Sequence, residues 1–186
     1  MPTPSVMVPL GTSAPDFALR SIDDTTVRLD DFADAPALLV TFLSNHCPYV
    51  RHIELEFGKL IAEFPDLAVV GICSNDTENY PDDAPAYLRE QRARAGWSFP
   101  YLVDSTQEVA RAYQAACTPD FFLYDRERKL AYRGAFDYST PGNGKPVTGE
   151  LLHTAITRVL AGQPVPLPHR PSLGCSIKWR PGNEPA

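Results

Sequence analysis

The chain has 186 residues, a formal net charge of −6, and a composition that is 44% hydrophobic and 10% aromatic. This length fits one domain with tails, and the apolar content supports a buried core, which excludes a disordered chain. The acidic balance argues against nucleic-acid binding, and no apolar stretch approaches the roughly 20 residues of a membrane span.

The 19 prolines gather at the two ends of the chain, with four in residues 1–15 and six in residues 163–186. We therefore predict a compact domain over residues 1–162 and a proline-rich arm over residues 163–186 that packs back on this domain. The N-terminus lacks the basic start and apolar core of a secretory signal, so we expect a cytoplasmic location. In that reducing compartment, cysteines are free or redox-cycling rather than parts of a permanent disulfide framework.

The first half of the chain combines apolar runs typical of strands with one run of helical spacing. Two short apolar patches flank Asp23 and Asp24 and predict a hairpin. Two later runs, rich in β-branched residues, are typical of strands buried in a parallel sheet, and Pro48 suits the first turn of the helix between them. The predicted elements are strands at residues 17–19, 27–29, 37–43 and 67–73, and a helix over residues 48–64.

The second half predicts three helices and a second hairpin. Asp82 and Asp83 suit the positive end of the first helix, whereas Asp137 and Tyr138 are interpreted as solvated loop residues. The predicted elements are a helix over residues 82–95 opened by Pro81, a strand over 101–103, a helix capped by Asp104 or Ser105 and running through Ala115, a hairpin of 121–124 and 130–132, and a helix capped by Thr148 and stopped by Gly162.

Cys47 stands between a predicted buried strand and the helix that begins at Pro48. There the N–H groups and the positive dipole end of the helix favour the thiolate, the reactive form in disulfide exchange and in attack on a peroxide. Ser44 can offer its hydroxyl to the thiolate or to a bound oxygen. The alternative is a buried structural cysteine. We favour the functional interpretation because a cysteine between a strand and a helix start is placed for activation.

Four segments match a known family pattern: GTSAPDF at residues 11–17, NHCPYV at 45–50, FPYLVD at 99–104 and CTPDFF at 117–122. On these segments, and on the tail PSLGCSIKW at 171–179, the chain resembles the thioredoxin-like redoxins, in the AhpC/TSA (peroxiredoxin) branch. The resemblance implies an α/β thioredoxin-like fold, with a central mixed sheet flanked by helices, an N-terminal hairpin extension and an inserted helix.

The resemblance implies a site formed by Cys47, Ser44, Thr118 and Pro119. Ser44 and Cys47 match the second half of the peroxiredoxin motif, but Val40 stands where that motif has proline. Pro119 takes the place of a peroxiredoxin arginine and resembles the cis-proline of thioredoxins, so we expect a cis Thr118–Pro119 bond near the thiol. Ser44 replaces the first cysteine of a thioredoxin Cys-x-x-Cys motif, so the usual neighbouring thiol is absent.

Without that neighbour, disulfide chemistry at Cys47 needs a distant cysteine or an external thiol. Cys117 would lie beside Pro119 and is either a resolving thiol or a packed residue in a turn. Cys175 lies in the proline-rich arm, which resembles the C-terminal resolving arm of two-Cys peroxiredoxins; the alternative is an anchored tail cysteine. Cys73 ends a predicted buried strand and is expected to be part of the core.

These observations predict a thiol-based oxidoreductase in which Cys47 reduces peroxides, an antioxidant role, or exchanges disulfides. Its expected partners are a peroxide or disulfide substrate and an external thiol reductant such as a thioredoxin. No cofactor is needed, and no cysteine or histidine spacing fits a metal site. The alternatives are a thioredoxin-like protein disulfide reductase and a non-enzymatic redox sensor or binding module. We expect a monomer or homodimer with no nucleic-acid or membrane partner.

Overall fold

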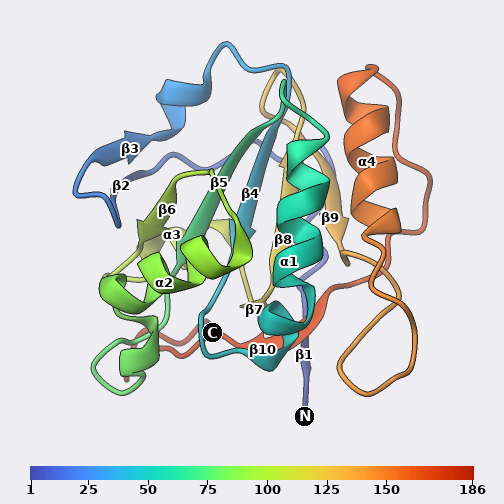
Figure 1. Cartoon of the computed structure of the whole chain (residues 1–186). Helices are drawn as coiled ribbons and strands as arrows, with labels where there is room; N and C mark the ends of the chain where they lie inside the picture. Colours follow the sequence, from blue (N-terminus) through green and yellow to red (C-terminus); the bar gives the residue numbers. More distant parts are fainter.

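A seven-stranded mixed sheet runs through the centre of the molecule in the order β3-β2-β6-β5-β4-β8-β9 (Figure 1). The computed structural model describes all residues from Met1 to Ala186. β4, β5 and β6 are parallel, and the other neighbours in this sheet are antiparallel. The strands are β2 (Ala18–Ser21), β3 (Thr26–Arg28), β4 (Leu38–Phe42), β5 (Ala68–Cys73), β6 (Tyr101–Val103), β8 (Asp120–Tyr124) and β9 (Leu130–Gly134).

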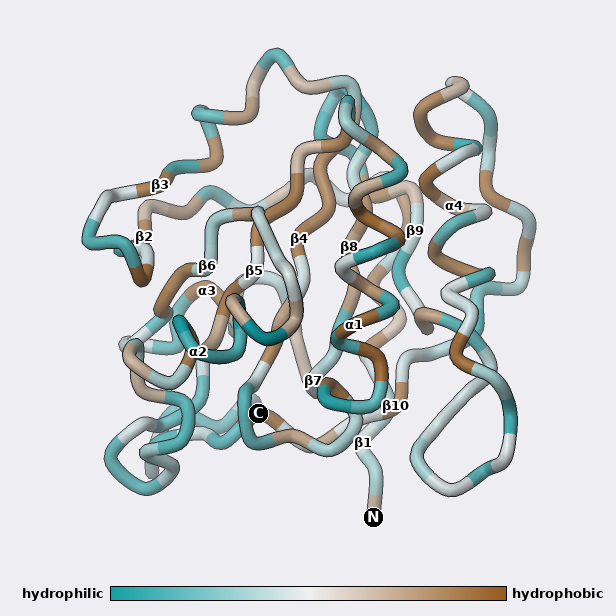
Figure 2. Tube along the Cα trace, in the orientation of Figure 1, coloured by the Kyte–Doolittle hydropathy of each residue, from teal (hydrophilic) through white to brown (hydrophobic).

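Helices cover both faces of this sheet. They are α1 (Pro48–Ala62), α2 (Pro85–Ala95), α3 (Glu108–Tyr113) and α4 (Glu150–Leu160), with 3-10 turns η1 (Leu29–Phe32) and η2 (Pro81–Asp83). One core packs α1, α2 and α4 against the sheet around Phe57, and a second core packs α3 against the other face through Tyr113. Figure 2 shows the hydrophobic residues along β4 and β5, between these two layers. None of the helices combines the length and apolarity that crossing a membrane requires.

A second, three-stranded sheet joins the two ends of the chain to the start of α1. Its strand order is β1-β10-β7, where β1 is Thr3–Pro4, β10 is Leu173–Ser176 and β7 is Cys117–Thr118. β10 lies between the other two strands, and it pairs antiparallel with β1 through residues 173–174 and with β7 through residues 175–176. In Figure 1 the red β10 passes beside the first turn of α1. The proline-rich arm therefore contributes a strand, which its sequence did not predict.

The predicted α/β order is confirmed, but two helix starts in the middle of the chain are wrong. The helix expected over residues 82–95 is broken at Ala84, which is extended, and α2 begins at Pro85. The cause is Pro85, which disfavours helical geometry in the residue before it. The next helix begins only at Glu108, although the Asp104 carboxylate still accepts hydrogen bonds from two N–H groups of its first turn.

The start of α4 also differs from its prediction. The residue before the helix is Gly149, rather than Thr148, and its φ is 66°. The backbone N–H groups of Thr148 and Gly149 donate to Asp137 at 2.7 and 2.9 Å. Asp137 is therefore a buried loop anchor, with 3% exposure, and its interpretation as a solvated loop residue is wrong. Tyr138 beside it is exposed, as expected.

Candidate active site

Cys47 occupies the position immediately before α1 and is fully buried, with 0% exposure. Its backbone is extended, and Pro48 opens the helix after it. The thiol donates a hydrogen bond to the backbone oxygen of Thr118 at 3.2 Å. The sulfur thus lies between the N-terminal end of a 15-residue helix and strand β7.

The arm places a second thiol beside Cys47. Cys175 lies directly opposite Thr118 in the β10–β7 pair, and it is partly exposed. Cys175 packs against the core cluster that contains Cys47, and the Thr118 residue opposite it in the strand pair is the one whose backbone oxygen accepts from the Cys47 thiol. Burial, followed by the Cys47 thiol, raises the pKa of Cys175. Two thiols therefore share the N-terminal end of one helix.

The close approach of the two strands depends on Gly174. A Cβ atom at this position would lie 2.0 Å from the backbone oxygen of Thr118, well inside van der Waals contact. The Ser172 hydroxyl donates to the backbone oxygen of Pro119 at 2.6 Å, which fixes the arm just before this point. Only glycine allows β10 to pass so close to β7, and this spacing sets where the next residue, Cys175, presents its sulfur.

The segment from Cys117 to Asp120 forms the floor of the site. The Thr118–Pro119 peptide bond is cis, as expected. Cys117 is buried and its thiol donates to the Pro119 oxygen at 3.7 Å, and burial raises its pKa well above the ordinary value. Asp120 is also buried; one carboxyl oxygen accepts from the N–H of Ala116 at 3.2 Å and the other has no partner. Burial raises the pKa of Asp120 to about 8.

The Ser44 hydroxyl does not make the contact with sulfur that the sequence predicted. It donates instead to the carboxylate of Asp83, at 3.1 and 3.2 Å from its two oxygens. Ser44 belongs to the loop before α1, whereas the residue three positions after Cys47 is Val50, buried in the first helical turn. Residues three positions apart lie on the same face of a helix, so a cysteine at position 50 would adjoin Cys47. Val50 occupies this position and supplies no thiol.

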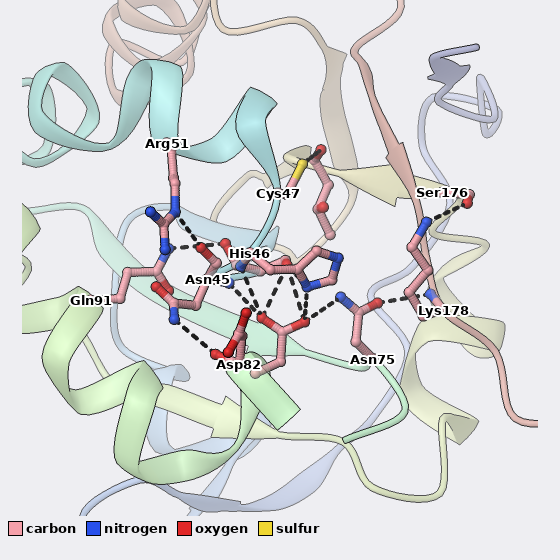
Figure 3. Close-up of polar contacts among 12 residues, drawn as sticks. Asn45, His46, Cys47, Arg51, Asn75, Asp82, Gln91, Ser176 and Lys178 are labelled. Carbon is pink, nitrogen blue, oxygen red and sulfur yellow. Dashed lines mark hydrogen bonds and ion pairs between the residues drawn. The ribbon is translucent and has the colours of Figure 1, made fainter. Parts of the chain in front are cut away.

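A buried carboxylate, that of Asp83, holds the loop that leads into Cys47, in which Figure 3 labels Asn45 and His46. It accepts hydrogen bonds from the backbone N–H of Asn45 at 2.7 Å and from the Asn75 amide at 2.8 Å, and it lies 2.5 Å from Nδ1 of His46. Burial raises the pKa of Asp83, but the hydrogen bonds from His46 and Asn75 outweigh it, and the net pKa is lowered. A negative charge is therefore stabilised beneath residues 44–46.

The same cluster is connected to the arm. The Asn75 side-chain oxygen accepts from the backbone N–H of Lys178 at 2.8 Å, and the Lys178 oxygen accepts from the Gln107 amide at 2.9 Å (Figure 3). The Lys178 ammonium lies 5.8 Å from the centre of the Tyr80 ring, which stacks on His46. These contacts hold the arm just after Cys175. Sequence reasoning gave no role to Asn75 or Gln107, because neither belongs to a motif.

The site contains no recognisable metal centre. No group of three or more His, Cys, Asp or Glu side chains in the structure is arranged to hold a metal ion. The chemistry that the arrangement can perform is thiol chemistry, since the thiols of Cys47, Cys175 and Cys117 lie near one another.

The AhpC/TSA family profile matches residues 10–133, which is most of the chain. The chain belongs to the AhpC/TSA family. Within this family of thiol-disulfide oxidoreductase-like proteins, it is 26% identical over 136 residues to the thiol-disulfide oxidoreductase ResA of Geobacillus thermodenitrificans, covering 69% of this chain and 70% of ResA. The family relationship points to oxidoreductase chemistry.

Solved structures show similarity over nearly the whole chain. A hypothetical protein of Sinorhizobium meliloti is 47% identical with a TM-score of 0.95, covering 97% of this chain and 100% of its own. The thioredoxin domain of a thiol-disulfide oxidoreductase of Bacteroides vulgatus is 19% identical with a TM-score of 0.57, covering 68% of this chain and 88% of its own. The second match shows the fold alone, and that fold is thioredoxin-like, as expected.

Proposed function

We propose that this protein is a thiol–disulfide oxidoreductase whose redox pair is Cys47 and Cys175. The observation that carries the proposal is the placement of the two thiols near one another, which arises because β10 pairs with β7 and sets Cys175 opposite Thr118. The backbone oxygen of Thr118 accepts from Cys47, which fixes the position of the buried sulfur. In this proposal, Ser44 positions the loop through Asp83 and Pro119 shapes the floor, and Cys117 is structural.

The pair can carry two electrons without a cofactor. One thiolate of the pair attacks a substrate disulfide, forms a mixed disulfide and releases one substrate thiolate, which takes up a proton. The other thiolate then attacks the mixed disulfide, releases the second substrate thiolate and leaves a Cys47–Cys175 disulfide. An external thiol reductant, such as a thioredoxin, returns the pair to the dithiol in the reducing cytosol where we propose that the protein works.

The contacts around Cys47 favour disulfide exchange over peroxide reduction. A peroxide needs room at the sulfur and a donor for its departing oxygen, but Cys47 is fully buried and the Ser44 hydroxyl is engaged by Asp83. A disulfide reaction needs a second thiol, and Cys175 already lies near the first. We therefore place disulfides ahead of peroxides as substrates.

The proposal is tested by mapping the disulfide formed after the reduced protein reacts with one equivalent of glutathione disulfide. We expect a Cys47–Cys175 cross-linked peptide in the wild type and in a Cys73→Ala control, and none in Cys47→Ser or Cys175→Ser. Reduction of glutathione disulfide by dithiothreitol, measured alongside, should be accelerated only by proteins that retain the pair. Absence of the cross-link, or turnover of hydrogen peroxide faster than turnover of disulfides, would overturn the proposal.

A further inference from the structure

We propose that external thiols and disulfides of low molecular weight exchange with Cys175, and that Cys47 is the inner thiol that never bonds to the external partner. This inference rests on the redox pair proposed above and assigns the order of its two sulfurs. Cys47, at the start of α1, would then react second and attack the mixed disulfide on Cys175, although its place in the sequence predicts that it is the first nucleophile.

The first argument is access. Cys47 has 0% exposure, whereas Cys175 is partly exposed and is followed by the exposed Ser176. Disulfide exchange proceeds through an in-line approach to sulfur, so a fully covered sulfur reacts only after part of the structure opens. While the arm is in place, an external partner can reach the pair only from the side of Cys175.

The second argument is that the arm is firmly held. β10 is bonded on one edge to β1 and on the other to β7. Ser5 and Ser172 exchange two hydrogen bonds, each of 2.9 Å, before β10, and Lys178 is held by Asn75 and Gln107 after it. β10 therefore already occupies the edge of β7 beside Cys175, where an extended polypeptide would otherwise pair, and the partner that fits the remaining space is a small thiol or disulfide compound.

The third argument is the direction in which a disulfide breaks. When an external thiolate attacks the Cys175 sulfur of the oxidised pair, a Cys175–substrate bond forms, the Cys47–Cys175 bond breaks, and Cys47 leaves as a thiolate. Cys47 leaves from the start of α1, where helix N–H groups stabilise negative charge. Attack at Cys47 would instead require the external thiolate to reach a sulfur with 0% exposure. Steric access therefore selects attack at Cys175.

The test uses the two single-thiol variants with glutathione disulfide as the probe and mass spectrometry to locate the adduct. In Cys47→Ser, we expect a stable glutathione adduct on Cys175. In Cys175→Ser, the adduct should form on Cys47 more than about tenfold more slowly, because the arm must open first. A Cys73→Ala/Cys117→Ala background removes the other thiols as acceptors in both variants, and circular dichroism confirms that each variant is folded.

A further variant separates burial from intrinsic reactivity. Gly174→Ala drives a Cβ atom against the Thr118 oxygen and should lift β10 from β7. Combined with Cys175→Ser, it should restore fast adduct formation on Cys47. Equal rates in the two single-thiol variants, or faster reaction at Cys47, would overturn the assigned order while the wild-type Cys47–Cys175 cross-link still stands. Loss of that cross-link in the wild type would instead refute the redox pair itself.

Discussion

Replacement of Asp120 by asparagine should stabilise the protein above neutral pH and flatten the dependence of its stability on pH. Asp120 is fully buried, accepts one hydrogen bond from Ala116 and leaves one carboxyl oxygen unpaired. Burial raises its pKa from 3.8 to about 8. The folded chain therefore keeps a proton on Asp120 that the unfolded chain releases once the pH exceeds about 4.

The sign and size follow from proton linkage. Stability from this group is complete below the unfolded value near pH 4 and falls as the pH rises towards 8, because the unfolded state binds fewer protons in that range. Each pH unit between the unfolded and folded pKa values of Asp120 lowers the free energy of unfolding by about 1.4 kcal/mol. The difference between about 4 and about 8 therefore limits the loss to about 6 kcal/mol. Asparagine removes this cost but places an amide donor at the unpaired position, which costs about 1–3 kcal/mol. We expect a net gain of about 3 kcal/mol at pH 8 for Asp120→Asn.

Urea unfolding, followed by tryptophan fluorescence between about pH 5 and pH 8.5, measures the effect directly. The control is Asp34→Asn, a matched change at an exposed carboxylate, which should leave the pH dependence as it is in the wild type. The reasoning is refuted if the stability curves of wild type and Asp120→Asn run parallel across this range, or if the variant is the less stable protein at pH 8.

Three other changes probe the site. Asp83→Ala removes a carboxylate buried under residues 44–46 and should lower the free energy of unfolding, measured in urea, by about 3–5 kcal/mol. Because the pKa of Asp83 is lowered in the folded state, the wild type should itself lose this stabilisation as the pH falls below about 4. Asn75→Ala removes the acceptor for Lys178 and should cost about 1–3 kcal/mol and speed amide exchange at Lys178, whereas unchanged exchange would mean that the arm is held elsewhere. Gly174→Ala should cost about 1–3 kcal/mol by overpacking, and an equally stable variant would contradict the close strand approach.

The strands and helices of the central sheet could be predicted because their signals are local. The apolar run of β4 and β5 and the helical spacing of α1 are visible within single windows of sequence, and the structure follows them closely. β10 could not be predicted, since LGCS has neither alternation nor β-branched residues. This strand is extended because β1 and β7 pair with it on both edges, and those partners come from distant parts of the chain.

The residues of the candidate site also fall into those with local sequence signals and those whose positions depend on distant parts of the chain. Cys47 and Pro119 carry recognisable motifs, and Cys175 was one of two candidates to approach Cys47; the structure sets it opposite Thr118. Asp83 was interpreted as the acidic start of a helix, because the groups that bury it lie 38 and 39 residues earlier. The Ser44 hydroxyl was expected to contact the sulfur for the same reason. The acceptor that it contacts instead, the Asp83 carboxylate, is distant in the sequence and could not be predicted from the spacing of Ser44 and Cys47.

The placement of β10 affects which strands and cysteines a fragment keeps when its boundaries follow the family match. The matched family segment ends at residue 133, whereas β10 begins at Leu173. A fragment trimmed to the family boundary would lose the strand that covers β7, and the exposed N–H and C=O groups of that edge would invite pairing with other chains. The same fragment would keep Cys47, Cys73 and Cys117 but lose Cys175, the thiol that β10 sets opposite Thr118.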